Sequence, residues 1–160
     1  MSYTLQALVA DEAAIRKAAL PDAVVVPLPQ GKAMIPLSDE MREAHDISFF
    51  PLTDEGVAEV PDGITVIAEA IAKAGRVAYV EAEFFAGDGT QACATWDATI
   101  RASHPLVDAG AINTALRFLG VKVGDHHDEF DALGLGRYRA TEDWLQMAEP
   151  GASGNSRPAA

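Results

Sequence analysis

Three polar side chains on one predicted strand are the first candidates for chemistry. Tyr79, Glu81 and Glu83 are spaced two residues apart, and side chains at that spacing lie on the same face of a β-strand. Two neighbouring carboxylates can serve as general acid and base when their surroundings drive their pKa values apart. The pattern places no nucleophile or histidine beside them, and solvated surface glutamates produce the same sequence. We therefore treat this face as a candidate ligand-facing surface and assign no catalytic residue.

A second concentration of reactive side chains is the run His-His-Asp-Glu-Phe-Asp at 126–131, which holds five potential metal ligands. Adjacent side chains do not easily converge on one ion, and the sequence contains no second ligand cluster. We predict a solvated acidic loop with no metal and no other cofactor. Gly87-Asp88-Gly89-Thr90 is likewise predicted to be a turn and not a phosphate-binding loop, because strands flank it on both sides and no lysine follows.

The third candidate is a basic and aromatic segment near the C-terminus. Arg137, Tyr138, Arg139 and Trp144 fall within eight residues, and these residue types are enriched at the energetic centres of protein interfaces. Thr141 could equally begin a short helix whose Trp144 packs on the core. We predict that Trp144 is docked in this way and that Arg137, Tyr138 and Arg139 bind a partner.

The elements that position these residues can be predicted from periodicity and turn residues. The predicted strands are 3–9, 23–26, 32–37, 76–85 and 91–96. The predicted helices are 11–20, 64–74, 111–119, one capped by Ser38 and one beginning at Thr141. A Gly-Asp-Gly segment joins 76–85 to 91–96 as a hairpin, since glycine tolerates the positive φ angles of a tight turn. Within this hairpin, Val80, Ala82 and Phe84 are expected to face the core while Glu81 and Glu83 are more exposed.

This order of elements predicts an α+β two-layer sandwich, with an antiparallel or mixed sheet and helices mainly on one face. Residues 1–149 are expected to form a single domain. Residues 150–160 are small, polar and proline-containing, so we expect a disordered C-terminal tail.

Composition limits the partners that the chain can bind. Its 160 residues include 12 Lys and Arg against 24 Asp and Glu, for a formal net charge of −12. Nucleic acid and anionic membranes repel such a chain, whereas a basic protein attracts it. The single cysteine, Cys93, allows no internal disulfide, and the N-terminus lacks a signal peptide. These features favour a cytoplasmic location.

Four segments of the chain resemble a family of small acidic bacterial proteins whose activity is not established. They are the hairpin at 79–91, Asp-Glu-Phe-Asp at 128–131, Gly-Leu-Gly-Arg at 134–137 and Thr-Glu-Asp-Trp-Leu at 141–145. Proteins of this kind are similar in size and charge to the immunity proteins that neutralise bacterial toxins. The resemblance implies no catalytic residues.

The leading functional hypothesis is a non-enzymatic, acidic protein-binding module, an immunity-type inhibitor of a basic bacterial toxin or nuclease. One alternative is a small enzyme or ligand-binding domain that uses the Tyr79, Glu81 and Glu83 face. The other is a structural subunit of a larger assembly.

Overall fold

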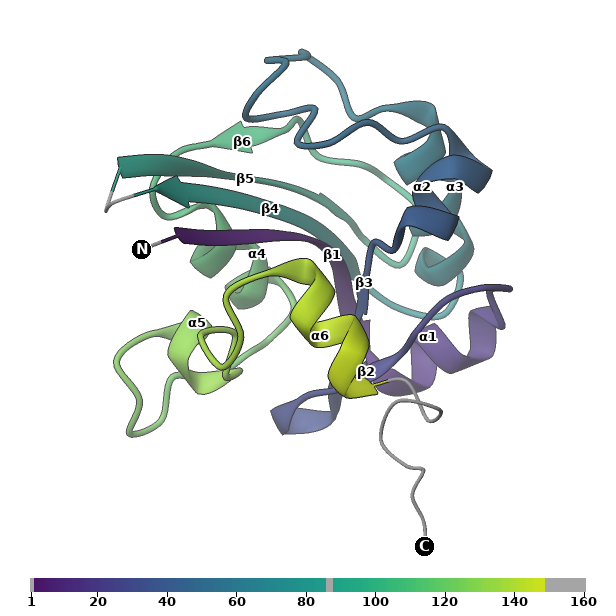
Figure 1. Ribbon diagram of the computed structural model, residues 1–160. Helices are drawn as coiled ribbons and strands as arrows, with labels where there is room; N and C mark the ends of the chain where they lie inside the picture. The colour runs from purple at the N-terminus through teal and green to yellow at the C-terminus, as the bar shows by residue number, and fades with distance from the viewer. Residues whose placement is uncertain (1, 86–87, 149–160) are drawn as a thin grey trace, which may run out of the picture.

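The computed structural model describes residues 2–85 and 88–148, which form one six-stranded sheet with helices packed on it (Figure 1). The predicted tail at 150–160 lies outside the described residues. The strands are β1 (Ser2–Asp11), β2 (Val26–Pro27), β3 (Lys32–Pro36), β4 (Val77–Phe85), β5 (Asp88–Trp96) and β6 (Leu106–Val107). The helices are α1 (Glu12–Ala18), α2 (Asp39–His45), α3 (Asp62–Ala72), α4 (Ala111–Phe118), α5 (Glu129–Ala132) and α6 (Thr141–Ala148), with a short 3₁₀ turn η1 (Pro29–Gly31) before β3.

The sheet has the order β2-β3-β1-β4-β5-β6, and every pair of neighbouring strands is antiparallel. The α+β class is confirmed, and so is the hairpin: β4 pairs with β5, with Tyr79 opposite Ala94. The predicted strand at 23–26 is wrong except at its last residue: the observed edge strand β2 is Val26–Pro27, and Pro27 has no N–H to donate.

Helices cover both faces of the sheet, so the layering differs from the predicted two-layer sandwich. Apolar side chains of α1, α2 and α3 pack on one face. Side chains of α4, α5 and α6 pack on the other. The central strands β1 and β4 are therefore enclosed from both sides, and β4 is fully buried from Val77 to Ala82. Both side-chain sets of one strand can be buried only in such a three-layer arrangement.

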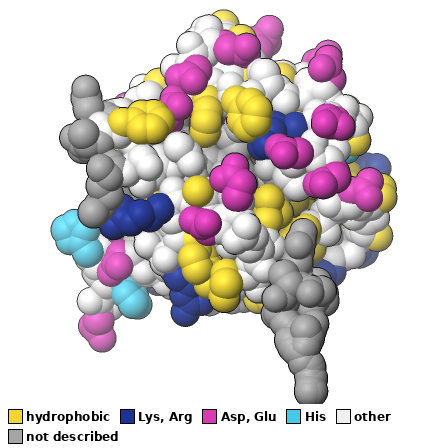
Figure 2. All heavy atoms as spheres, in the orientation of Figure 1, with side chains coloured by type: hydrophobic (Ala, Val, Ile, Leu, Met, Phe, Trp, Pro, Cys, Tyr) yellow, Lys and Arg dark blue, Asp and Glu magenta, His cyan; other side chains and the backbone are white. Residues whose placement is uncertain are grey.

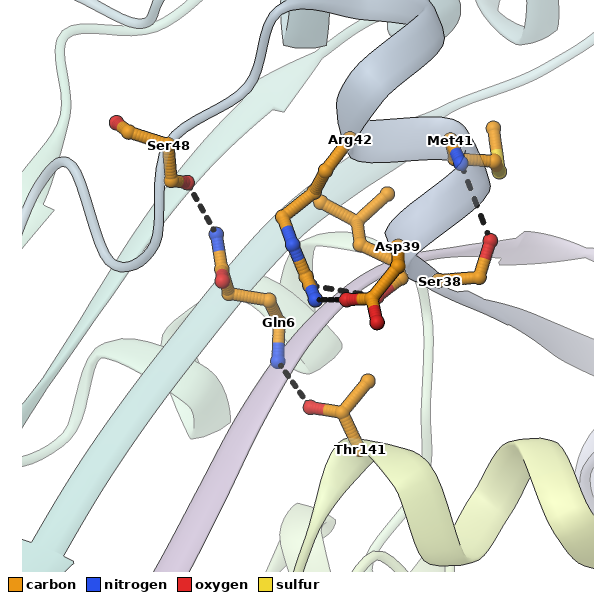
Figure 3. A network of polar contacts seen from close by, with 8 residues as sticks. Gln6, Ser38, Asp39, Met41, Arg42, Ser48 and Thr141 are labelled. Carbon is orange, nitrogen blue, oxygen red and sulfur yellow. Dashed lines mark hydrogen bonds and ion pairs between the residues drawn. The ribbon is translucent and has the colours of Figure 1, made fainter.

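The N-terminal half of β1 has no strand partner on its β3 side, because pairing with β3 begins at Ala7. The segment leading into α6 fills this position. Thr4 N donates to the carbonyl of Arg139 at 2.8 Å. Gln6 N donates to the hydroxyl of Thr141 at 3.1 Å (Figure 3). The backbone at 139–141 thus continues the sheet and holds α6 against β1.

Helix α2 begins as predicted, with the Ser38 hydroxyl accepting a hydrogen bond from Met41 N at 3.2 Å (Figure 3). Its C-terminal end lies against the first turn of α3. A Cβ added to Gly63 would lie 2.0 Å from the carbonyl oxygen of His45, so only glycine allows this approach. The contact sets the position of α2, where the exposed acidic side chains described below are found. In the part of the chain that the structure describes, no helix has the length and apolar character needed to cross a bilayer.

Candidate functional site

The prediction that Glu81 is more exposed than its neighbours is wrong, because its side chain is completely buried. Alternation along β4 correctly places Tyr79 and Glu81 on one face, but that face is covered by α3 and by the loop between α2 and α3. Four donors surround the carboxylate. Oε1 accepts from Leu52 N at 3.2 Å and from the Tyr79 hydroxyl at 2.7 Å. Oε2 accepts from Thr53 N at 2.7 Å and from Thr53 Oγ1 at 2.8 Å.

This arrangement satisfies a buried charge and ties the loop to the sheet. Tyr79 is fully buried, and burial together with the neighbouring Glu81 carboxylate raises the pKa of its phenol well above the usual value. The side-chain amide of Gln6 donates to the Tyr79 hydroxyl at 3.0 Å and to the carbonyl of Ser48 at 3.3 Å. Tyr79 and Glu81 are therefore closed to solvent and committed to structural hydrogen bonds. They have no free surface on which to contact a substrate.

Glu83 is the partly exposed member of the predicted ligand-facing set. Its carboxyl group shares a hydrogen bond with that of Asp54, in the loop between α2 and α3. This contact, partial burial and the negative charges of Asp54 and Glu81 raise the pKa of Glu83 to about 7. Two neighbouring carboxyl groups hold one proton between them more easily than none. Glu83 thus favours docking of the loop most when it is protonated.

We expect this pair to make stability depend on pH. The folded-state pKa of Glu83 lies above the ordinary value of 4.5, so its stabilising contribution is complete below about pH 4.5 and is lost as pH rises through about 7. Glu83→Gln cannot ionise, so its free energy of unfolding should rise by about 1 kcal/mol relative to that of wild type between pH 4.5 and pH 8. The figure is this small because solvent screens part of the effect. Urea unfolding at the two pH values measures this change in stability. Glu59→Gln, at an exposed glutamate of the loop that carries Asp54, is the control. An equal pH dependence in Glu83→Gln and wild type would contradict it.

The largest concentration of exposed acidic side chains lies over α2, the following loop and the start of α3. Figure 2 shows them along the top and upper right of the molecule. The exposed acids between residues 39 and 62 are Asp39, Glu40, Glu43, Asp46, Asp54, Glu55, Glu59 and Asp62. Arg42 is the one Lys or Arg between Lys32 and Lys73. We call this region the acidic surface.

The acidic surface contains a hollow of about 270 Å³, which we call the acidic hollow. It is lined by Asp39, Arg42, Glu43, Asp46, Ile47 and Phe49. The Arg42 guanidinium is nearly buried beneath it, where it pairs with Asp39 and donates to the carbonyl of Leu37 at 2.7 Å. The same group lies 3.9 Å from the centre of the Phe49 ring, which is 57 % exposed. The one basic group of the hollow is thus engaged within the chain, while Glu43 and Asp46 face solvent.

The structure separates the three residues predicted to bind a partner. Arg137 and Tyr138 line a groove on the opposite face of the sheet. The Tyr138 ring packs edge-on against Trp144, with 4.7 Å between ring centres, and the predicted docking of Trp144 is confirmed by its 3 % exposure. Arg139 has an exposed side chain, and its carbonyl oxygen belongs to the sheet extension at Thr4. A partner-binding role for these three residues stays a prediction.

The remaining sequence candidates lie apart from these surfaces. His126 and His127 are exposed, and His126 lies 3.4 Å from the carboxylate of Asp131. Over residues 2–85 and 88–148, no three His, Cys, Asp or Glu side chains are grouped to hold a metal ion. Cys93 is buried in β5, and burial raises the pKa of its thiol to about 11, which disfavours the reactive thiolate.

Comparison of the chain with protein-family models, with curated proteins and with solved structures finds no match.

Proposed function

We propose that this chain is a non-enzymatic protein-binding module that docks a basic protein partner on its acidic surface. The observation that carries the proposal is the acidic hollow, where exposed Glu43 and Asp46 stand beside the exposed ring of Phe49. A lysine or arginine side chain of a partner would find carboxylates and an aromatic face there. The surrounding acids would add long-range attraction and speed the encounter.

The enzyme alternative gains no support from the geometry, because Glu81 and Tyr79 are sealed and hydrogen-bonded within the chain. Size and negative charge favour the finer proposal that the partner is a bacterial toxin or nuclease and that binding neutralises it. That step is an analogy with immunity proteins and has its own test.

The test is affinity capture on immobilised wild-type chain from lysates of cells that encode it. The matched variants are Glu43→Gln/Asp46→Asn in the hollow and Asp22→Asn/Glu69→Gln outside it. Both pairs remove two exposed carboxylates, and both replace one aspartate at positive φ, 54° for Asp46 and 64° for Asp22, by asparagine, which tolerates that conformation.

The expected result is a basic protein that wild type and the outer variant retain and that the hollow variant loses. For the finer proposal, the captured protein should be toxic when expressed alone and harmless when coexpressed with this chain. Equal retention by both variants, or capture of acidic proteins only, would refute the proposed surface.

A further inference from the structure

A second surface site lies on the opposite face of the sheet, between two segments more than 100 residues apart in sequence. It is a groove of about 530 Å³, within the range of about 300–1,000 Å³ that is typical of small-molecule sites. One wall is the edge segment 25–29, which includes β2. The other wall is formed by the turn before α6 and by α6 itself, and hydrophobic side chains gather on the surface beside α6 (Figure 2). We call this site the β2–α6 groove.

Most side chains that line the β2–α6 groove are aliphatic or aromatic, and one is charged. Val26, Leu28, Leu133 and Met147 supply aliphatic surface, and Tyr138 and Trp144 supply aromatic surface. Arg137 is the one charged residue among the described residues that line it. The ion pairs found among the described residues do not include Arg137. An arginine at the border of an apolar groove is therefore available to a ligand.

Trp144 adds an independent observation. Its ring is 3 % exposed and lines the groove, yet its indole N–H has no acceptor among the described residues. A buried donor without an acceptor destabilises the fold, and most such groups obtain a partner from water or a ligand. Among the described residues, the groove thus has a cation that forms no ion pair and a buried N–H group that has no acceptor.

From these contacts we infer that the β2–α6 groove binds a small apolar molecule that carries one carboxylate. The apolar part would lie along the aliphatic and aromatic lining, and the carboxylate would pair with the Arg137 guanidinium, whose planar N–H groups match a carboxylate in two-point contact. The net charge of the chain makes a preference for an anionic ligand a specific test of the Arg137 contact. A chain of charge −12 repels anions at long range and attracts cations, so a preference for the anion can arise only locally.

Calorimetric titration with octanoate, 1-octanol and octylammonium tests the inference, because these probes have alkyl groups of the same length and differ in the charge of the head group. Octanoate should bind at one site per chain, at least tenfold more tightly than octylammonium. Arg137→Gln should weaken octanoate at least tenfold, whereas Arg139→Gln, an exposed neighbour of equal charge outside the groove, should change it less than twofold. Amide chemical shifts of wild type should move at 25–29 and 133–147.

Absent binding of octanoate, equal binding of octylammonium, or unchanged affinity in Arg137→Gln would each overturn the inference. Circular dichroism of both arginine variants checks that the fold is retained. The groove and the acidic hollow lie on opposite faces of the sheet, so either proposal can fail without the other.

Discussion

Replacing Glu81 with glutamine should lower the free energy of unfolding by about 2–4 kcal/mol at pH 7. The carboxylate of Glu81 accepts from Leu52 N, the Tyr79 hydroxyl, Thr53 N and Thr53 Oγ1. A glutamine has one acceptor oxygen, and its NH₂ group would face donors on the other side. At least one buried N–H would lose its partner, and the remaining bonds would lose the strength that a charged acceptor gives.

Urea unfolding of Glu81→Gln beside Glu59→Gln measures this difference. The control removes a carboxylate from the exposed part of the same loop and should stay within about 0.5 kcal/mol of wild type. Hydrogen exchange adds a local readout, since the amides of Leu52 and Thr53 should exchange faster in Glu81→Gln. Equal stability of Glu81→Gln and wild type would show that the carboxylate does not hold the loop.

The second large effect is expected on binding of the basic partner. Neutralising two carboxylates of the acidic hollow in Glu43→Gln/Asp46→Asn should raise the Kd about 10- to 100-fold, or about 1.4–2.7 kcal/mol. Both substitutions keep the size of the side chain, so the loss reports charge. Because exposed charges are screened, the difference between variant and wild type should shrink as salt rises.

Surface plasmon resonance at 50 and 500 mM NaCl, with the captured partner as analyte, separates this effect from a general loss of charge. Asp22→Asn/Glu69→Gln reduces the net charge by the same amount and should change the Kd less than threefold. If both double variants weaken binding equally, the overall charge of the chain and not the hollow controls association.

Local features of the fold could be predicted because their causes are local. The Gly-Asp-Gly segment predicted the β4–β5 hairpin, and Ser38 before two acids predicted the start of α2. Period-two alternation also correctly grouped Tyr79 with Glu81. It could not show that their face is covered, because the cover comes from a loop about 30 residues earlier in the chain, whose contacts with Glu81 depend on the fold.

The candidate sites were harder to predict for the same reason. Charge counting pointed to a basic partner, and the near absence of Lys and Arg between 33 and 72 was visible in the sequence. That Arg42 is buried beneath Phe49 and leaves Glu43 and Asp46 unpaired depends on side-chain packing. The β2–α6 groove joins segments at opposite ends of the chain, and only the order of the strands brings them together.

The most direct measurement of where a partner docks is amide hydrogen exchange of the chain with and without the captured basic protein. We expect slower exchange in the complex at 39–50, which includes α2 and Phe49, and unchanged exchange at 137–148. Protection confined to 137–148, with 39–50 exchanging as in the free chain, would contradict it and place the partner on the face that carries Arg137 and Tyr138.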